Sequence, residues 1–136
     1  MNKCSNYHHG DLRNALIMAA VELIEESGSP EFAISDAAKR AGVSAAAPYR
    51  HFKDRNDLLE AICDLYFIGL GEEVAATRAA FPQGSREGII ALGHTYVQYL
   101  LSKSAFYNLA WNREQGVEKD PVNRPGFQTF IGAVEA

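Results

Sequence analysis

The side chains best suited to bind a polyanion gather between residues 39 and 55. This stretch contains five bases and one acid, a local net charge of +4, and its bases are Lys39, Arg40, Arg50, Lys53 and Arg55. Residues 57–136 contain ten acids and six bases, and the whole chain has a formal net charge of −4. A basic segment on an acidic body predicts phosphate contacts confined to one face. Without a binding motif, an ordinary solvated pair of helices would be the simpler interpretation.

Four neighbouring side chains could meet the edges of nucleic-acid bases: Ala45, Ala46, Ala47 and Arg50. An alanine methyl can contact the methyl group of thymine, but it cannot donate a hydrogen bond. Arg50 is therefore the side chain of this set that can bind O6 and N7 of guanine with two hydrogen bonds. A contact with phosphate is the alternative role for Arg50.

Two short helices around residues 41–44 would position these side chains. Gly42 can adopt the left-handed conformation that ends a first helix, which we expect to run from residue 34 or 35 to residue 41. The side-chain oxygen of Ser44 can accept hydrogen bonds from the free N–H groups of a second helix, expected over residues 44–52. The pattern predicts a helix-turn-helix whose second helix can lie in a major groove of DNA.

This motif resembles the DNA-binding signature of the tetracycline-repressor (TetR) family. The matching residues are 38–44 (Ala-x-x-Ala-Gly-Val-Ser), 49–53 (Tyr-Arg-His-Phe-Lys) and 58–59 (Leu-Leu). Residues 7–13, Tyr-His-His-Gly-Asp-Leu-Arg, resemble the lead-in of one subgroup, so the resemblance covers roughly residues 7–80. It implies a ligand-responsive transcriptional regulator, in particular a repressor, that binds a palindromic operator in double-stranded DNA as a homodimer and responds to a small-molecule effector.

The resemblance also implies roles for single residues. Tyr49 and His51 belong to the phosphate-facing rim, and Arg55 occupies the position of a lysine that usually contacts phosphate. Lys53 is a further expected phosphate contact, whereas Phe52 should be buried in the core. The complete predicted DNA-binding set is Ser35, Ser44, Ala45, Ala46, Ala47, Tyr49, Arg50, His51, Lys53 and Arg55.

Three residues depart from the usual pattern of that family. Ala33 stands where a Thr or Ser commonly caps the first helix of the motif, a loss of about 1 kcal/mol unless Ser35 takes over the cap. Ser35 stands where an Arg often reaches a phosphate, so it can donate a hydrogen bond there but carries no charge. Pro48 lacks an N–H, so the opening turn of the second helix should be loosened or the regular helix should begin near Pro48.

Apolar periodicity predicts an all-α chain. Besides the motif, we expect helices over residues 12–27, 54–80, 85–103, 105–112 and 127–136, and we expect Asp54 to cap the second of these. The helix over residues 85–103 should turn inward Ile89, Leu92, Tyr96, Tyr99 and Leu100. Residues 1–53 then form the helix-turn-helix DNA-binding domain, and residues 54–136 form an incomplete helical domain for ligand binding and dimerisation.

The second predicted domain is rich in aromatic residues, which are common in small-molecule sites. The candidates for effector binding are Tyr66, His94, Tyr96, Tyr99, Tyr107 and Trp111. Aromatic side chains at helical spacing more often form a core than a ligand site, so core packing is the alternative for this set.

Cysteine usage and hydropathy suggest the compartment. Cys4 and Cys63 do not make a disulfide framework and the N-terminus lacks the apolar run of a signal peptide, so we expect the reducing cytoplasm. Residues 88–102, the longest uncharged stretch, are too few to cross a bilayer, and we expect no membrane span. Cys4, His8 and His9 could supply three metal ligands, but no fourth ligand stands at a recognisable spacing. We therefore expect neither a metal nor a cofactor.

Two other functional classes were weighed. An enzyme is poorly supported, because Gly69-x-Gly71 lacks the third glycine of a dinucleotide loop and the chain has no serine nucleophile elbow. A helical ligand-binding or interaction module without specific DNA binding is the stronger alternative, since Ala33, Ser35 and the alanine-rich reading segment weaken the DNA contacts.

The length of the chain bears on dimerisation. Members of the TetR family, which this sequence resembles, are usually well over 136 residues long and dimerise through their last two long helices. The chain is then a fragment, a shortened form, or a protein that dimerises differently. An end in the middle of a helical pattern at residues 132–136 favours a fragment.

Overall fold

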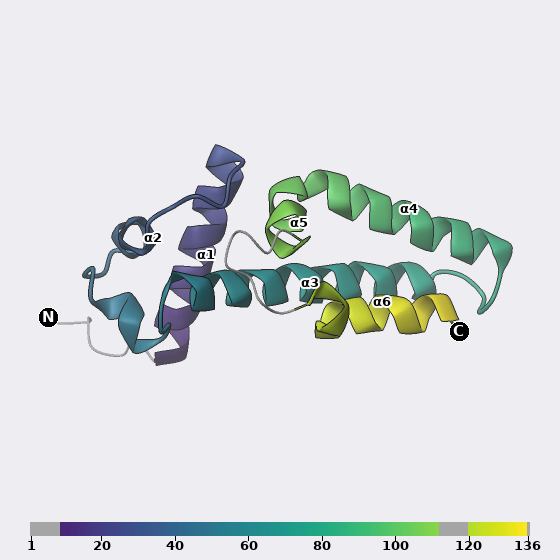
Figure 1. Cartoon of the computed structure of the whole chain (residues 1–136). Coiled ribbons are helices and arrows are strands. Elements are labelled where there is room, and N and C mark those ends of the chain that lie inside the picture. Colours follow the sequence, from purple (N-terminus) through teal and green to yellow (C-terminus); the bar gives the residue numbers. More distant parts are fainter. Residues whose placement is uncertain (1–8, 112–119, 136) are drawn as a thin grey trace, which may run out of the picture. The chain divides into compact units, whose positions relative to one another are not determined.

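The computed structural model describes residues 9–111 and 120–135, and the regular elements within these ranges are all helical (Figure 1). The α-helices are α1 (His9–Ser27), α2 (Ile34–Arg40), α3 (Arg55–Ala79), α4 (Arg86–Ser102), α5 (Ser104–Trp111) and α6 (Pro125–Glu135). Two short 3₁₀ helices are η1 (Ala47–Arg50) and η3 (Pro121–Asn123). The all-α expectation is confirmed, and the expected helices other than the reading helix begin and end within three residues of their predicted bounds. Among these helices none is long and apolar enough to cross a bilayer.

The first of two compact units comprises residues 1–62, and its boundary with the second unit falls inside α3. Its core consists of side chains from α1, α2, the segment after η1 and the first two turns of α3. The buried apolar residues are Leu16, Ile17, Ala19, Ala20, Ile24, Ala37, Ala38, Phe52, Leu58, Leu59 and Ile62. The prediction that Phe52 is a core residue is confirmed, because its side chain is 1% exposed.

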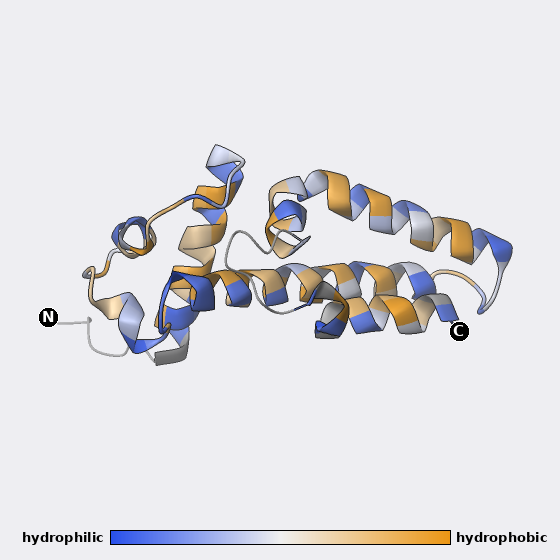
Figure 2. Ribbon diagram, in the orientation of Figure 1, coloured by the Kyte–Doolittle hydropathy of each residue, from blue (hydrophilic) through white to orange (hydrophobic). Residues whose placement is uncertain are grey.

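The second unit comprises residues 63–136. In it, α4 runs back along the later part of α3, and α6 lies beside them (Figure 1). Apolar bands, orange in Figure 2, follow these helices. Two polar contacts connect α3 with α4: the Tyr99 hydroxyl donates to the backbone oxygen of Tyr66 at 2.7 Å, and the hydroxyl oxygens of Thr77 and Thr95 are 2.7 Å apart. Gly69 lies beneath the Tyr99 ring, so α4 approaches α3 closely there.

A charged side chain is enclosed in this second unit. Arg124 is fully buried, and its Nη1 donates to Asp64 Oδ1 at 2.7 Å. The guanidinium carbon also lies 5.9 Å from the centre of the Phe67 ring. A buried charge is tolerated only when it is paired, so Asp64 offsets much of the desolvation cost of Arg124. No sequence pattern predicts this pair, since its partners are 60 residues apart.

One prediction about α4 is wrong. Ile89, expected to face inward, is 59% exposed and shares an outward face with Ile90, Val97 and Leu101. Gly88 is buried in its place, with Ser85 and Phe81 close to it, and Leu92 is buried as predicted. Because consecutive helical residues are rotated by about 100°, burying position 88 carries position 89 out of the core. Tyr96, Tyr99 and Leu100 are half-buried.

Candidate nucleic-acid interface

The turn after α2 has the geometry predicted from Gly42. Gly42 has φ +75°, a conformation that non-glycine residues rarely adopt. Its N–H donates to the Lys39 oxygen at 3.1 Å, and the Val43 N–H donates to the Ala38 oxygen at 3.0 Å. These two bonds form a Schellman motif, which satisfies carbonyl groups that the end of α2 would otherwise leave unpaired. The prediction for Gly42 is confirmed.

The reading segment differs from the α-helix predicted over residues 44–52. The structure has a turn followed by the 3₁₀ helix η1, with hydrogen bonds three residues apart from the Tyr49 N–H to the Ala46 oxygen and from the His51 N–H to the Pro48 oxygen. Pro48, in the first turn of η1, has no N–H to donate, which prevents a regular α-helical start. The loosening expected from Pro48 is therefore confirmed, but the continuous helix is wrong.

The predicted capping role of Ser44 is also wrong. The residue before η1 is Ala46, and no side chain caps this end. Ser44 contributes its backbone oxygen, which accepts from the Ala47 N–H at 3.1 Å. Its side chain is exposed, and the turn at residues 45–46 separates it from the start of η1.

The outer and inner faces of this segment are distinct. Pro48 and Phe52 are buried, and the Phe52 N–H donates to the Pro48 oxygen at 2.9 Å. Tyr49 is 57% exposed. The other exposed members of the predicted DNA-binding set are Ser35, Ser44, Ala45, Ala46, Arg50 and Lys53, whereas Ala47, His51 and Arg55 are half-buried. Most of the predicted set thus lies on one exposed stretch of chain.

Arg55 has a different environment from the one that the family resemblance implies. Its Nε donates to the backbone oxygen of Phe32 at 2.8 Å, and its Nη2 donates to the backbone oxygen of Pro30. The guanidinium carbon lies 5.1 Å from the centre of the Phe32 ring. Arg55 therefore holds the loop before α2 against the start of α3. The structure thus gives Arg55 a structural role, and its contact with phosphate stays a prediction.

Arg40 also binds within the protein, in this case to acidic residues of α1. Its Nη1 and Nη2 donate to the two carboxylate oxygens of Glu26 at 2.5 and 2.7 Å, and Glu22 Oε2 lies 3.5 Å from Nη1. The hydrogen bond from Arg40 lowers the pKa of Glu26. Because the pKa of Glu26 is lower in the folded state, this exposed ion pair contributes its stability in full above the pKa of a glutamate in the unfolded chain. That stability is lost as the pH falls through the folded-state pKa.

Because Arg40 and Arg55 already bind oxygen atoms of the protein, fewer basic side chains remain for contacts with a polyanion. Of the five bases between residues 39 and 55, Lys39, Arg50 and Lys53 remain exposed without an ion pair among the described residues. The backbone at Lys53 is fixed, because its N–H donates to Asp57 Oδ2 at 3.0 Å. Asp54 caps α3 as predicted, since its Oδ1 accepts from the Asp57 N–H at 2.9 Å.

The cap of α2 also has a partner that the sequence analysis missed. Ala33 precedes α2 and has no capping side chain, as expected. Asp36 makes the reciprocal bond of a capping box, because its Oδ2 accepts from the Ala33 N–H at 3.1 Å. Ser35 therefore does not take over the cap and stays exposed on α2. An acidic residue three positions after the cap is the signal that could have identified Asp36.

The predicted effector residues lie in the second unit, where several of their rings pack against one another. Tyr66 is buried, and its ring centre is 5.1 Å from that of Tyr99. Burial raises the pKa of Tyr66, and burial with nearby acidic charge raises the pKa of Tyr99 to about 12, so both phenols stay protonated at neutral pH. Tyr96 stacks on Phe130 at 4.6 Å between ring centres. These residues are mainly packing partners.

The remaining candidates are at the surface of that unit. Tyr107 and Trp111 have ring centres 5.9 Å apart, and Trp111 is 42% exposed. His94 is exposed and, with Tyr99, lines an open groove of about 370 Å³ that also includes Glu73 and Lys103. Of the potential metal ligands, Cys4 and His8 lie outside the described residues, and the described part of the chain contains no cluster of three such groups.

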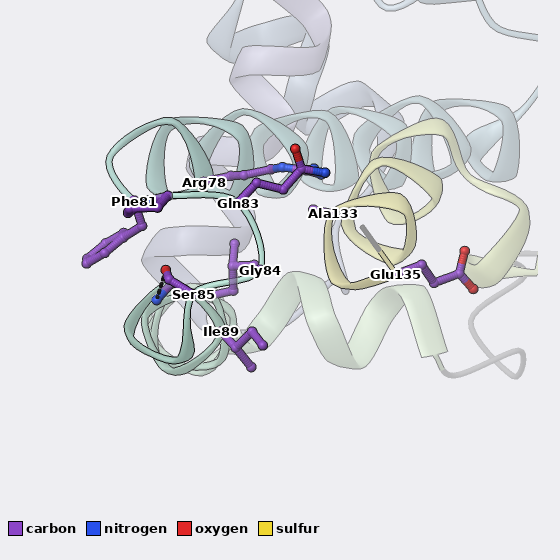
Figure 3. A pocket seen from close by; sticks show the side chains of 11 residues that line it. Arg78, Phe81, Gln83, Gly84, Ser85, Ile89, Ala133 and Glu135 are labelled. Atoms are coloured by element: carbon purple, nitrogen blue, oxygen red, sulfur yellow. Dashed lines mark hydrogen bonds between the residues drawn. The ribbon is translucent and has the colours of Figure 1, made fainter.

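A second hollow, of about 240 Å³, was not predicted. It lies between the turn that joins α3 to α4 and the end of α6. Figure 3 shows Arg78 and Gln83 on one side of it and Ser85 and Ile89 on another, while the ring of Phe81 points away. None of the predicted effector residues lines this hollow.

Comparison with known proteins identifies the first unit. Residues 16–62 match the family model described as bacterial regulatory proteins, tetR family. The unit with the Gly42 turn is therefore a TetR-type helix-turn-helix domain. The lead-in at residues 7–13 precedes this match and lies partly outside the described residues, so its subgroup assignment stays a prediction.

Similar proteins extend the comparison. The HTH-type transcriptional regulator BetI of Escherichia coli O139:H28 is 40% identical over 75 residues, which is 55% of this chain and 38% of that protein. BetI of E. coli O9:H4 and of E. coli K12 match equally. A solved structure of a protein with unknown function from Rhodococcus sp. RHA1 has a TM-score of 0.69 and 28% identity, covering 97% of this chain and 64% of that one.

Proposed function

We propose that this chain is a transcriptional regulator that binds specific sequences in duplex DNA. The observation that carries the proposal is the Gly42 turn, which presents the exposed residues 44–46, Tyr49 and Arg50 on a domain that matches the tetR family. Exposed bases beside this segment supply attraction to phosphate.

The proposal extends to the assembly and its control. We propose a palindromic operator bound by two copies of the chain, repression as the outcome in the cytoplasm, and a small-molecule effector that binds the aromatic second unit. Support comes from the similarity to the BetI regulators and from the tyrosines around Tyr66. Two linked readers gain of the order of 100-fold in affinity when their spacing fits the site.

Salt dependence of DNA binding is the experiment that tests this function. With Lys39 and Lys53 on phosphate and Arg50 on a base, one reader should lose about 12-fold in affinity between 50 and 200 mM salt. The loss would be about 40-fold if Arg50 also neutralised a phosphate, and about 500-fold for five phosphate-binding bases. Fluorescence anisotropy of the chain with a duplex selected from random sequences, palindromic and half-site, measures the loss. A change below tenfold, or equal affinity for unrelated duplexes, would favour the module without specific DNA binding.

Arg50 and Lys53 should have different effects on recognition. Arg50→Ala should reduce discrimination at one base step by about 1–3 kcal/mol, because a bidentate contact with guanine is lost. Lys53→Ala should weaken binding to all sequences about equally and reduce the salt slope by about 0.9. Binding of both variants to the selected site and to its single-base changes decides the roles. A uniform loss for Arg50→Ala would assign Arg50 to phosphate.

A further inference from the structure

The two side chains at the tip of the reading segment, those of Ala45 and Ala46, are both methyl groups. Ala45 and Ala46 are the central residues of the turn closed by the bond from the Ala47 N–H to the Ser44 oxygen, and both are exposed. Ala46 has φ −84° and ψ −21°, close to the third position of a type I turn. The structure thus places two adjacent methyls, and not the three predicted from the sequence, on the exposed tip, because Ala47 is half-buried.

The position of this tip relative to Arg50 defines its role. Ala45 and Ala46 come one turn before Tyr49 and Arg50, and all four are exposed, whereas Pro48 is buried between them. In a segment with hydrogen bonds three residues apart, side chains three positions apart align, so Ala46 shares a face with Tyr49. The two methyls therefore lie on the exposed stretch that also carries Arg50, which the proposed function directs into the major groove.

The chemistry of these methyls leaves one specific partner on a base edge. Neither alanine side chain can donate or accept a hydrogen bond, so the donors and acceptors of guanine, cytosine and adenine cannot be distinguished by them. The C5 methyl of thymine is the apolar group that the four standard bases present in the major groove. We infer that Ala45 and Ala46 select thymine by contact with its methyl group, in the half-site that Arg50 also reads. This inference rests on the proposed function.

Replacing single thymines by deoxyuridine tests the inference, because deoxyuridine lacks the C5 methyl and keeps every hydrogen-bonding group. At one or two thymines in each half-site, the replacement should weaken binding of the full chain about fourfold, the effect of removing one methyl-sized apolar contact. Thymines elsewhere in the duplex should tolerate it. Anisotropy at fixed salt, with the site selected from random duplexes, gives the ratio of the two affinities.

Variants of the chain assign the effect to the methyls. Ala45→Gly or Ala46→Gly should bind the thymine and deoxyuridine duplexes equally at the affected position, whereas Ala76→Gly, on an exposed part of α3 in the second unit, should keep the fourfold ratio. Far-ultraviolet circular dichroism confirms that each variant is folded. Unchanged ratios in both alanine variants, or no thymine sensitive to deoxyuridine, would overturn the inference while specific binding stands. Selection that enriches no sequence would overturn the proposed function and this inference together.

Discussion

Arg55→Lys is expected to lower the free energy of unfolding of the first unit by about 1–2 kcal/mol although it keeps the charge, and Arg55→Ala by about 2–4 kcal/mol. Arg55 donates two hydrogen bonds to the backbone oxygens of Phe32 and Pro30 and covers the Phe32 ring. A hydrogen bond from a charged group contributes about 1.5–3 kcal/mol, and lysine cannot reproduce the forked geometry of arginine. Urea denaturation followed by circular dichroism measures the change.

Lys53→Ala is the matched control, since Lys53 is exposed and its backbone bond to Asp57 does not depend on the side chain. It should unfold within about 0.5 kcal/mol of the unchanged chain. DNA binding should show the opposite pattern to stability. The slope of affinity against salt concentration should be reduced for Lys53→Ala and unchanged for Arg55→Ala. If Arg55→Lys unfolds like the unchanged chain and Arg55→Ala lowers the salt slope, the phosphate role implied by the family resemblance is correct.

The Arg55 contacts show why part of this site could not be predicted. Gly42 was predictable, because a positive φ between two helices demands glycine and the neighbouring residues report the turn. Pro48 was predictable for the same local reason, since a missing N–H weakens any helix start. The acceptors of Arg55 are backbone oxygens 23 and 25 residues away, and any residue type could supply them. No sequence pattern therefore distinguishes an arginine that binds phosphate from one that binds its own backbone.

In the second unit, too, features set by neighbouring residues were predictable and features set by distant contacts were not. The bounds of α3 and α4 follow from local signals such as Asp54 and the Ser85 cap, whose Oγ accepts from the Gly88 N–H at 3.1 Å. Which face of α4 is buried depends on what approaches it, so the orientation of Ile89 was predicted wrongly. Gly69 was examined only as part of a dinucleotide loop, because its partner is 30 residues away on another helix.

Gly69 and Tyr99 should therefore be energetically coupled. Gly69→Ala should destabilise the unchanged chain but not the Tyr99→Phe variant. A Cβ at position 69 would overlap the Tyr99 hydroxyl and lie 3.4 Å from Tyr99 Cζ. Gly69→Ala alone should destabilise the second unit by about 1–3 kcal/mol, the usual cost of overpacking. Tyr99→Phe alone should cost about 0.5–1.5 kcal/mol, because the bond to the Tyr66 oxygen is lost.

In the Tyr99→Phe background the hydroxyl that causes the overlap is absent, and the remaining 3.4 Å contact is nearly ordinary van der Waals packing. Alanine is favoured over glycine inside a helix by about 1 kcal/mol, so Gly69→Ala should then be neutral or stabilising. The coupling energy should reach about 1–3 kcal/mol, a range typical of residues in direct contact. The fluorescence of Trp111, the single tryptophan of the chain, reports unfolding of this unit in urea. Single effects that add within about 0.5 kcal/mol would mean that Tyr99 can move aside, and that the close approach of α4 to α3 does not require glycine at position 69.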